Sequence, residues 1–166
     1  GQCVLEAGHG SGGLALHLAN ILGQNGTLVS VENRPEHAVV GRENMMRAAN
    51  ALKEFPDWTL IEGDIAEVSF EDVADEFDAI ILDLPEPWSV ISRLAKKIRY
   101  GGRIACYCPV SSQLEKAWEA CEEAGLHIDW AGEMIERVWT KASRGGVRPG
   151  NTPMGHTAFL LIAERT

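Results

Sequence analysis

Apolar positions recur along the chain with two different periods, and the two kinds of stretch alternate. Short apolar runs bounded by turn residues predict strands, and longer stretches with apolar positions three and four residues apart predict helices. The predicted strands are residues 3–7, 27–31, 58–61, 77–82, 103–108, 127–138 and 156–163. The predicted helices are residues 12–23, 35–53, 88–98 and 111–124. This alternation predicts repeated β-α units, and therefore a doubly wound α/β domain around a mostly parallel sheet.

Two further features of the pattern concern the middle and the end of the chain. The run at 77–82 is apolar almost throughout, which is typical of a central strand covered on both faces. The last two predicted strands are separated by a long loop rich in glycine and proline. Connections of this length in a compact domain are often functional. The pattern contains no internal repeat and no linker, so it predicts one domain.

Length and composition agree with a single globular domain. The chain has 166 residues, of which 45% are hydrophobic and 23% charged, and this composition excludes disorder and low complexity. No apolar run approaches the ~18 residues that span a membrane. The chain opens without a methionine or a signal peptide and enters a predicted strand at once, so we expect it to be part of a longer protein. Four cysteines without metal-site spacing predict reduced thiols in a cytosolic protein and no metal site.

The charge is acidic overall and unevenly distributed. Fifteen Lys and Arg against 24 Asp and Glu give a formal charge of −9, which excludes a nucleic-acid module that is basic over its whole surface. Twelve acids and no Lys or Arg lie between Lys53 and Arg93. The long loop instead carries Lys141, Arg144 and Arg148 without an acid. These three are candidates for contacts with RNA phosphates, although ordinary solvated positions would explain both stretches.

A glycine-rich turn lies between the first predicted strand and the first predicted helix. It runs from Glu6 to Gly13 and reads Glu-Ala-Gly-His-Gly-Ser-Gly-Gly. Glycines there permit a tight turn and let a ligand approach the helix N-terminus, at the ligand-binding edge of a doubly wound sheet. Gly8, Gly10 and Gly13 match the G-x-G-x-x-G of dinucleotide enzymes. Glu6, Gly8, Gly10 and Gly12 equally match the E-x-G-x-G-x-G of S-adenosylmethionine-dependent methyltransferases, so the turn alone leaves the cofactor open.

Two acids after later strands fit the ribose and the base of an adenosine. Glu32 follows the second predicted strand, where a carboxylate can accept hydrogen bonds from both ribose hydroxyls. Asp64 follows the third, where a carboxylate can accept a hydrogen bond from the adenine N6 amino group. Arg34 could meet the 2′-phosphate of NADP, but the charge of Glu32 opposes that ligand. Together with the glycine turn, Glu32 and Asp64 predict an adenosine site.

The fourth predicted strand ends in a proline-rich segment, Asp83-Leu-Pro-Glu-Pro-Trp88, which places Asp83 beside the cofactor site. With this segment the chain resembles the catalytic domain of the tRNA (adenine-58-N1)-methyltransferase family. The stretches that carry the resemblance are Val4-Leu-Glu-Ala-Gly-His-Gly-Ser-Gly-Gly-Leu14, Leu82-Asp-Leu-Pro-Glu-Pro-Trp88, Tyr107-Cys-Pro109 followed by Gln113, and Gly155-His-Thr-Ala-Phe-Leu160. They span nearly the whole chain in the order of the family.

The resemblance implies a fold, a cofactor and a set of site residues. It implies the Rossmann-like, seven-stranded sheet of class I methyltransferases, mostly parallel with the last strand antiparallel, and S-adenosylmethionine as the cofactor. The residues predicted to bind it, from the glycine turn and the resemblance together, are Glu6, Gly8, Gly10, Ser11, Gly12, Gly13, Leu14, Glu32, His37, Asp64 and Asp83. The resemblance also implies that Asp83 holds the target adenine and that Tyr107 stands beside it, so these two are the predicted catalytic residues.

Partners and a location are also implied by the resemblance. Members of the family act on tRNA, are typically homotetramers and belong to the cytoplasm. They carry a small N-terminal β-domain that has no counterpart in this sequence. We therefore expect residues 1–166 to be the catalytic domain alone.

Adenine N1 is a methyl acceptor that needs no base, because its lone pair is free to attack. Methylation leaves a positive charge on the base. A carboxylate that accepts the N6 hydrogen bond, the role expected of Asp83, orients the base and stabilises that charge. The target base must leave its stack, and Tyr107, Trp88 or Trp139 could stack on it. Trp88 and Tyr107 could equally pack into the core, and His156 is expected to have a structural role.

Three other functions stay open from the sequence alone. An enzyme of the same class could methylate a small molecule or a protein, which the acidic charge would suit. The G-x-G-x-x-G pattern would also suit an NAD-dependent oxidoreductase, although the proline-rich segment disfavours it. The third is a non-catalytic RNA-binding subunit of a methyltransferase pair, which would be expected to have lost the cofactor residues that this chain keeps.

Overall fold

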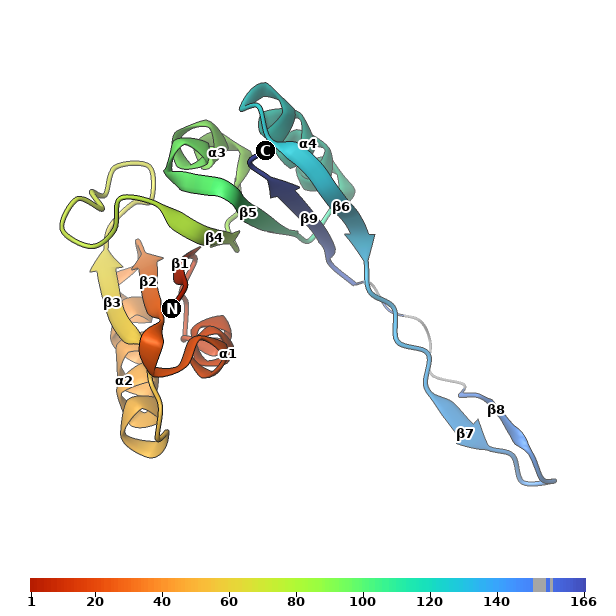
Figure 1. Cartoon of the computed structure of the whole chain (residues 1–166). Coiled ribbons are helices and arrows are strands. Elements are labelled where there is room, and N and C mark those ends of the chain that lie inside the picture. The colour runs from red at the N-terminus through yellow and green to blue at the C-terminus, as the bar shows by residue number, and fades with distance from the viewer. Residues whose placement is uncertain (151–154, 156) are drawn as a thin grey trace.

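A seven-stranded sheet forms the centre of the computed structural model, which describes residues 1–150, 155 and 157–166. Its strands are β1 (Cys3–Ala7), β2 (Thr27–Glu32), β3 (Asp57–Glu62), β4 (Phe77–Leu82), β5 (Ile98–Cys108), β6 (His127–Glu133) and β9 (Phe159–Glu164). They are arranged in the order β3-β2-β1-β4-β5-β9-β6 (Figure 1). β1 to β5 pair in parallel, and β9 runs antiparallel to both of its neighbours. The predicted doubly wound, mostly parallel sheet with an antiparallel last strand is therefore confirmed.

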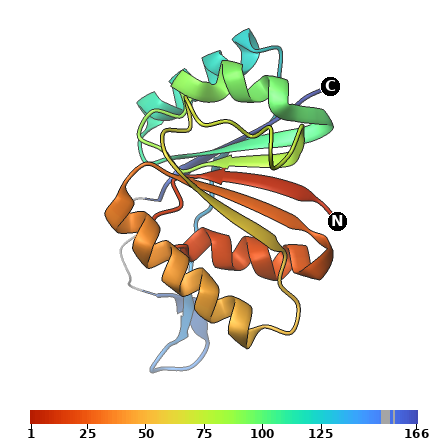
Figure 2. The ribbon, with the colours of Figure 1, turned by 90° about the vertical axis from the view of Figure 1, so that its left-hand side faces the viewer.

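Helices cover both faces of this sheet (Figure 2). They are α1 (Gly13–Leu22), α2 (Pro35–Ala51), α3 (Trp88–Leu94) and α4 (Ser111–Glu123). α1 and α2 lie on one face, and α3 and α4 lie on the other. In β4, Ile80 and Leu82 pack with α3 and α4, whereas Ala79 and Ile81 pack in the cluster beneath α1 and α2. Since successive side chains of a strand point to opposite faces, burial on both sides explains the apolar run at 77–82.

Two predicted boundaries around the fifth strand are wrong. The helix predicted over 88–98 gives way to a 3₁₀ turn, η2 (Ala95–Lys97), and β5 begins at Ile98, earlier than predicted. Pairing with β4 is irregular where Gly101 and Gly102 lie. In the sequence these two glycines indicate a turn between elements, but in the structure they interrupt one long strand, as in a β-bulge.

The structure departs from the prediction again between β6 and β9. β6 ends at Glu133, so the strand predicted to reach residue 138 is shorter. Part of the predicted loop forms a hairpin of β7 (Trp139–Lys141) and β8 (Val147–Pro149). A short η1 turn (Gly23–Asn25) likewise follows α1. Gly145 and Gly146 both have a positive φ, which the tight turn of the hairpin requires.

Residues 134–150, which we call the arm, extend away from the sheet (Figure 1). Met134, Val138 and Trp139 are exposed apolar side chains on it. The arm has four basic residues and one acid in a chain that is otherwise acidic. Its composition therefore suits contact with another molecule.

Two remaining expectations concern the end of the chain and membranes. His156, with its expected structural role, lies outside the described residues, and β9 begins at Phe159 rather than at 156. Within the described part of the chain, no helix combines the length and the apolar character needed to cross a membrane.

Candidate functional site

Four chain segments meet at the carboxyl edge of the parallel strands. The glycine turn follows β1, Glu32 ends β2, and Asp64 and Asp83 come just after β3 and β4. Parallel strands carry their carboxyl ends to one edge of the sheet, where ligands bind in doubly wound folds. The fold therefore brings together residues that are far apart in the sequence.

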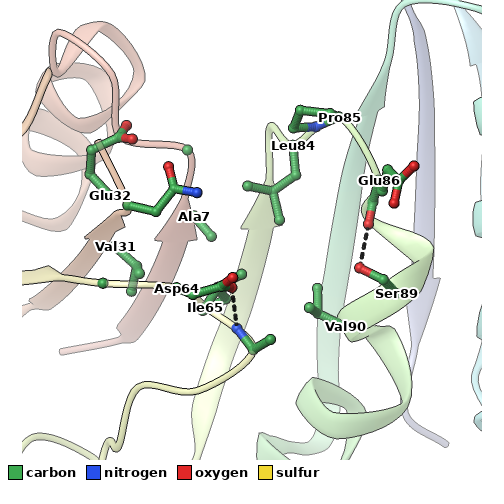
Figure 3. Close-up of a pocket in the computed structure, with 14 residues that line it drawn as sticks. Ala7, Val31, Glu32, Asp64, Ile65, Leu84, Pro85, Glu86, Ser89 and Val90 are labelled. Carbon is green, nitrogen blue, oxygen red and sulfur yellow. Dashed lines mark hydrogen bonds between the residues drawn. The ribbon is translucent and has the colours of Figure 1, made fainter. Parts of the chain in front are cut away.

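One cavity at this edge, about 380 Å³ in volume, has two acids on one side (Figure 3). Glu32 and Asp64 line it beside the apolar Val31 and Ile65. On the other side lie Leu84, Pro85, Glu86, Ser89 and Val90, from the segment after β4 and the start of α3. Carboxylate acceptors within a partly apolar wall suit a nucleoside, whose hydroxyl and amino groups donate while its base packs.

Glu32 is only 3% exposed, and the chain already holds its carboxylate. Its Oε2 accepts the backbone N–H of Gly10 at 2.7 Å, and its Oε1 accepts the backbone N–H of Arg34 at 3.0 Å. Burial raises the pKa of this carboxyl, but the two N–H groups and the Arg34 guanidinium outweigh burial, so the pKa is lowered overall. An ionised carboxylate has acceptor capacity beyond these bonds. Glu32 can therefore fix the glycine turn and hold two hydroxyls at the same time.

Asp64 is exposed at the cavity wall and oriented by a turn of its own. Its Oδ1 accepts the backbone N–H of Ala66 at 2.8 Å. Its carbonyl accepts the N–H groups of Glu67 and Val68, both at 2.9 Å. The turn thus fixes the direction of the carboxylate through the backbone.

A second cavity, about 500 Å³ in volume, shares three wall residues with the first. It is lined by Gly8, Gly10, Ser11, Arg34, His37, Asp83, Leu84, Pro85, Pro109 and Gln113. Burial and the negative charge of Glu6 raise the pKa of Asp83. A single carboxylate of raised pKa thus stands in a cavity that adjoins the one suited to a nucleoside.

The glycine turn brings β1 and β4 close together and leaves α1 open at its start. Gly8 has a φ of 90°, and a Cβ there would lie 2.0 Å from the backbone oxygen of Asp83. Only glycine permits this approach. At the N-cap Gly12 has a φ of 84°, and no side chain of the described residues caps α1. The first N–H groups of α1 can therefore bind an anionic group.

A buried hydrogen-bonded network lies beneath the glycine turn. Oε1 of Glu6 accepts the hydroxyl of Ser30 at 2.7 Å and lies 2.7 Å from Nδ1 of His9. Nε1 of Trp58 donates to Ser30 Oγ at 2.9 Å. Glu6 therefore lines neither cavity and supports the turn from within. Glu6 and His9 are three residues apart in the turn itself, whereas Ser30 and Trp58 reach them only through the pairing of β1, β2 and β3, which the sequence does not show.

The close fit of this network against α2 predicts that Gly41→Ala destabilises the fold. A Cβ at Gly41 would lie 2.3 Å from Nε2 of His9 and 2.8 Å from the carbonyl oxygen of Gly10. Alanine in a helix interior usually adds about 1 kcal/mol of stability over glycine, but overpacking at this position costs about 1–3 kcal/mol or more. We expect thermal unfolding to show a melting temperature lower by roughly 2–8 °C. The same substitution should cost less in a His9→Ala background, and a raised melting temperature in the single variant would contradict this packing.

Gln113 connects the segment after β4 to the start of α4. Its Nε2 donates to the carbonyl of Pro85 at 2.9 Å, and its Oε1 accepts the N–H of Val110 at 3.1 Å. The side chain thereby sets the spacing between the segment that carries Asp83 and the end of β5. Sequence reasoning gave Gln113 no role, although a glutamine at the third position of a helix often bonds back to the N-cap.

Several predicted residues line neither of these cavities. They are Glu6, Gly12, Gly13, Leu14, Tyr107, Lys141, Arg144 and Arg148. Tyr107 lies near the end of β5 and is 42% exposed. The three basic residues are exposed on the arm, and none of them lines either cavity. The structure thus separates a cofactor-type site from a basic surface.

The cysteines and the acids form no further site. Cys106, Cys108 and Cys121 are buried free thiols, and Cys3 is half-buried and also free. Burial raises the pKa of Cys121 to about 12, so it is not a ready nucleophile. Across residues 1–150, 155 and 157–166, no group of His, Cys, Asp and Glu could hold a metal ion.

Comparison with known proteins decides the family. Residues 1–144 match the family model described as "tRNA methyltransferase complex GCD14 subunit". The chain belongs to this family. The match includes every residue that lines the two cavities, so the GCD14 family assignment covers the whole candidate site.

The relatives and structural neighbours are longer than this chain. The tRNA (adenine(57)-N(1)/adenine(58)-N(1))-methyltransferase TrmI of Methanocaldococcus jannaschii is 35% identical over 99% of the chain, which spans only 64% of that relative. A SAM-dependent O-methyltransferase of Thermotoga maritima has a TM-score of 0.83 at 26% identity, covering 99% of this chain and 59% of that one. The tRNA (m1A58) methyltransferase TrmI of Aquifex aeolicus has a TM-score of 0.80 at 23% identity, covering 99% and 62%. These similarities confirm the class I methyltransferase fold.

Proposed function

We propose that the chain is the catalytic domain of an S-adenosylmethionine-dependent tRNA methyltransferase that acts on N1 of the adenine at position 58, in the T-loop. One observation carries the proposal: the cavity that holds Asp83 adjoins the cavity that holds Glu32 and Asp64. A nucleoside site beside a single carboxylate suits a methyl donor held next to an adenine that the carboxylate orients. The name of the Methanocaldococcus relative supports the same substrate.

The residues present fit the cofactor. Glu32 would accept hydrogen bonds from the ribose hydroxyls, and Asp64 would accept one from the N6 amino group of the adenine. The uncapped start of α1, at residues 11–14, would bind the carboxylate of the methionine part, and His37 would contact the cofactor from the second cavity. When bound, the cofactor supplies an activated methyl group, so the chain has only to bind and orient the acceptor.

Asp83 would hold the target adenine. Its carboxylate accepts a hydrogen bond from the N6 amino group of the target, which turns N1 toward the methyl donor. The same carboxylate stabilises the positive charge that the base acquires, an effect worth about 3–4 kcal/mol for one well-aimed group. Since N1 carries no proton to be removed, no base is needed.

Aromatic side chains would receive the unstacked base. Tyr107, exposed near the end of β5, is the candidate for stacking. Trp88 is half-buried with Nζ of Lys116 4.6 Å from its ring centroid, which supports a packing role for it. Trp139 is 59% exposed on the arm and would meet a more distant part of the RNA.

Calorimetry with S-adenosylhomocysteine and with NAD tests the cofactor assignment. We expect S-adenosylhomocysteine to bind and NAD to give no measurable heat. Both ligands carry an adenosine for Glu32 and Asp64, but the carboxylate of Asp83 in the second cavity opposes the negative pyrophosphate of NAD. Binding of NAD without S-adenosylhomocysteine would replace the methyltransferase proposal with an oxidoreductase.

The arm is proposed to contact tRNA phosphates through Lys141, Arg144 and Arg148. Replacing all three with alanine should weaken tRNA binding and lower the slope of log affinity against log salt by about two to three, which is one unit or slightly less for each phosphate that is no longer neutralised. Filter binding over a salt series measures both quantities.

A matched control removes three lysines elsewhere. Lys53, Lys96 and Lys97 lie outside the arm, after α2 and in η2, so their replacement with alanine changes the net charge equally. If both triple variants lose the same affinity and slope, the arm has no specific role.

A homotetramer located in the cytoplasm is proposed for the full-length protein. The family description, which names a complex subunit, and the exposed apolar side chains of the arm support an assembly. The mass of the full-length protein in solution tests it, since a monomer would exclude the tetramer.

A second candidate is an enzyme that methylates oxygen on a small molecule. The name of the Thermotoga neighbour favours it. A hydroxyl acceptor must lose a proton, and the raised pKa of Asp83 would make this carboxylate a better base than an ordinary aspartate. The products formed from RNA and from small hydroxylated molecules distinguish the two functions.

A further inference from the structure

The segment between β3 and β4 forms one side of the nucleoside-type cavity without a helix or strand to support it. In the described chain, residues 63–76 contain neither element. Asp64, Ile65 and Ala66 from this segment line the cavity. The segment carries six acids and no Lys or Arg of its own. Its own turns supply local hydrogen bonds, so contacts with other elements are needed to fix how it lies at the cavity.

Arg93, in the last turn of α3, provides such contacts. Its Nη1 donates to the carbonyl of Ile65 at 2.6 Å, and its Nη2 donates to the carbonyl of Val68. The guanidinium carbon also lies 5.4 Å from the centroid of the Phe70 ring, within cation–π range. One planar group thus contacts three points of the segment, and Ile65 and Phe70 are buried beneath it.

We propose that Arg93 is a positioning residue for recognition of the adenine base of the cofactor. The inference rests on the proposed function, because it takes the first cavity as an adenosine site. Val68 connects Arg93 to Asp64, since its carbonyl accepts a hydrogen bond from Arg93 and its N–H donates to the carbonyl of Asp64. Arg93 therefore holds closed the turn that directs the Asp64 carboxylate.

The geometry requires arginine rather than any cation. A guanidinium presents two parallel N–H groups in a fixed plane, which can reach two carbonyls at once. A lysine at position 93 ends in a single nitrogen, which cannot take the two positions that Nη1 and Nη2 occupy, so its hydrogen bonds to the two carbonyls would be poorer. We therefore expect Arg93→Lys to have an effect between that of the original residue and that of Arg93→Met.

The test compares S-adenosylhomocysteine with its 6-oxo analogue, in which inosine replaces adenosine and the N6 amino group is absent. Arg93→Met keeps the apolar part of the side chain. The substitution should weaken the binding of S-adenosylhomocysteine about tenfold or more, which is the loss expected for one charge-assisted hydrogen bond. Binding of the analogue should be weakened much less, because the analogue has no amino group to donate a hydrogen bond to Asp64. A variant that is merely partly unfolded would weaken both ligands by the same factor.

Arg99→Met serves as the matched control. Arg99 pairs with Asp78 at the opposite end of β4 and is 51% exposed, so its loss should change neither affinity. Equal weakening of both ligands by Arg93→Met, or no weakening of S-adenosylhomocysteine, would overturn the role of Arg93 while the proposed function stands. Failure of the unsubstituted protein to bind S-adenosylhomocysteine would overturn both.

Discussion

Replacing Asp83 with alanine is expected to lower the rate of methyl transfer about a hundredfold or more and to leave the affinity for S-adenosylhomocysteine nearly unchanged. The reason is its position: Asp83 lines the second cavity, apart from Glu32 and Asp64, so its loss leaves the two carboxylates that would hold the adenosine in place. Its carboxylate would therefore act on the acceptor base and on the charge that develops there. Single-turnover methylation and calorimetry on the same preparation separate the two effects.

The raised pKa of Asp83 adds a pH dependence to this expectation. Only the ionised carboxylate can stabilise the positive charge that the base acquires, and burial and the charge of Glu6 raise the pKa of Asp83. As the pH is lowered, the rate should therefore begin to fall at a higher pH than it would with an aspartate of ordinary pKa. Asp83→Asn should be slow at every pH and lack that fall. Unchanged turnover in Asp83→Ala would refute the catalytic role.

Replacing Glu32 with glutamine is expected to weaken the binding of S-adenosylhomocysteine by about ten- to a hundredfold, because each hydrogen bond to a charged group is worth about 1.5–3 kcal/mol. Both oxygens of Glu32 already accept backbone N–H groups, from Gly10 and Arg34. An amide NH₂ in place of one oxygen faces a donor there, so the glycine turn loosens and the ribose hydroxyls lose an acceptor at the same time. Calorimetry measures the weakened binding.

Glu36→Gln is the control for this substitution. Glu36→Gln is the same substitution made in the first turn of α2, where the side chain is exposed. Its replacement should leave the affinity unaltered. If Glu32→Gln binds S-adenosylhomocysteine as tightly as Glu36→Gln does, the first cavity does not hold the ribose through Glu32.

The strands of the sheet could be predicted from the sequence because the patterns that mark them are local. The continuous apolar run of β4 and the turn residues after each strand follow from which faces are buried, and the register of parallel strands then brings Glu32, Asp64 and Asp83 to one edge. Two of the differences from the prediction involve glycines. Gly101 and Gly102 lie inside β5, whereas Gly145 and Gly146 form a hairpin turn in a predicted loop.

The contacts that hold the site in place could not be predicted, because they join residues without a fixed spacing. The network of Glu6 with His9 and Ser30 depends on how β1 pairs with β2, and the reach of Arg93 depends on how α3 lies beside the segment after β3. Such contacts appear only when the register and the packing are known. Sequence reasoning thus found the groups expected to touch ligand but missed the groups that orient them.

The most direct test of the account uses unmodified tRNA and methyl-labelled S-adenosylmethionine. Because the chain spans 64% of its Methanocaldococcus relative, the assay is best run on the full-length protein. After the reaction the tRNA is digested and its nucleosides are separated by mass spectrometry. We expect labelled 1-methyladenosine, and we expect it to be lost when Asp83 is replaced with alanine. Label in another nucleoside, or none while S-adenosylhomocysteine still binds, would contradict methylation of adenine N1 and direct the search to other acceptors.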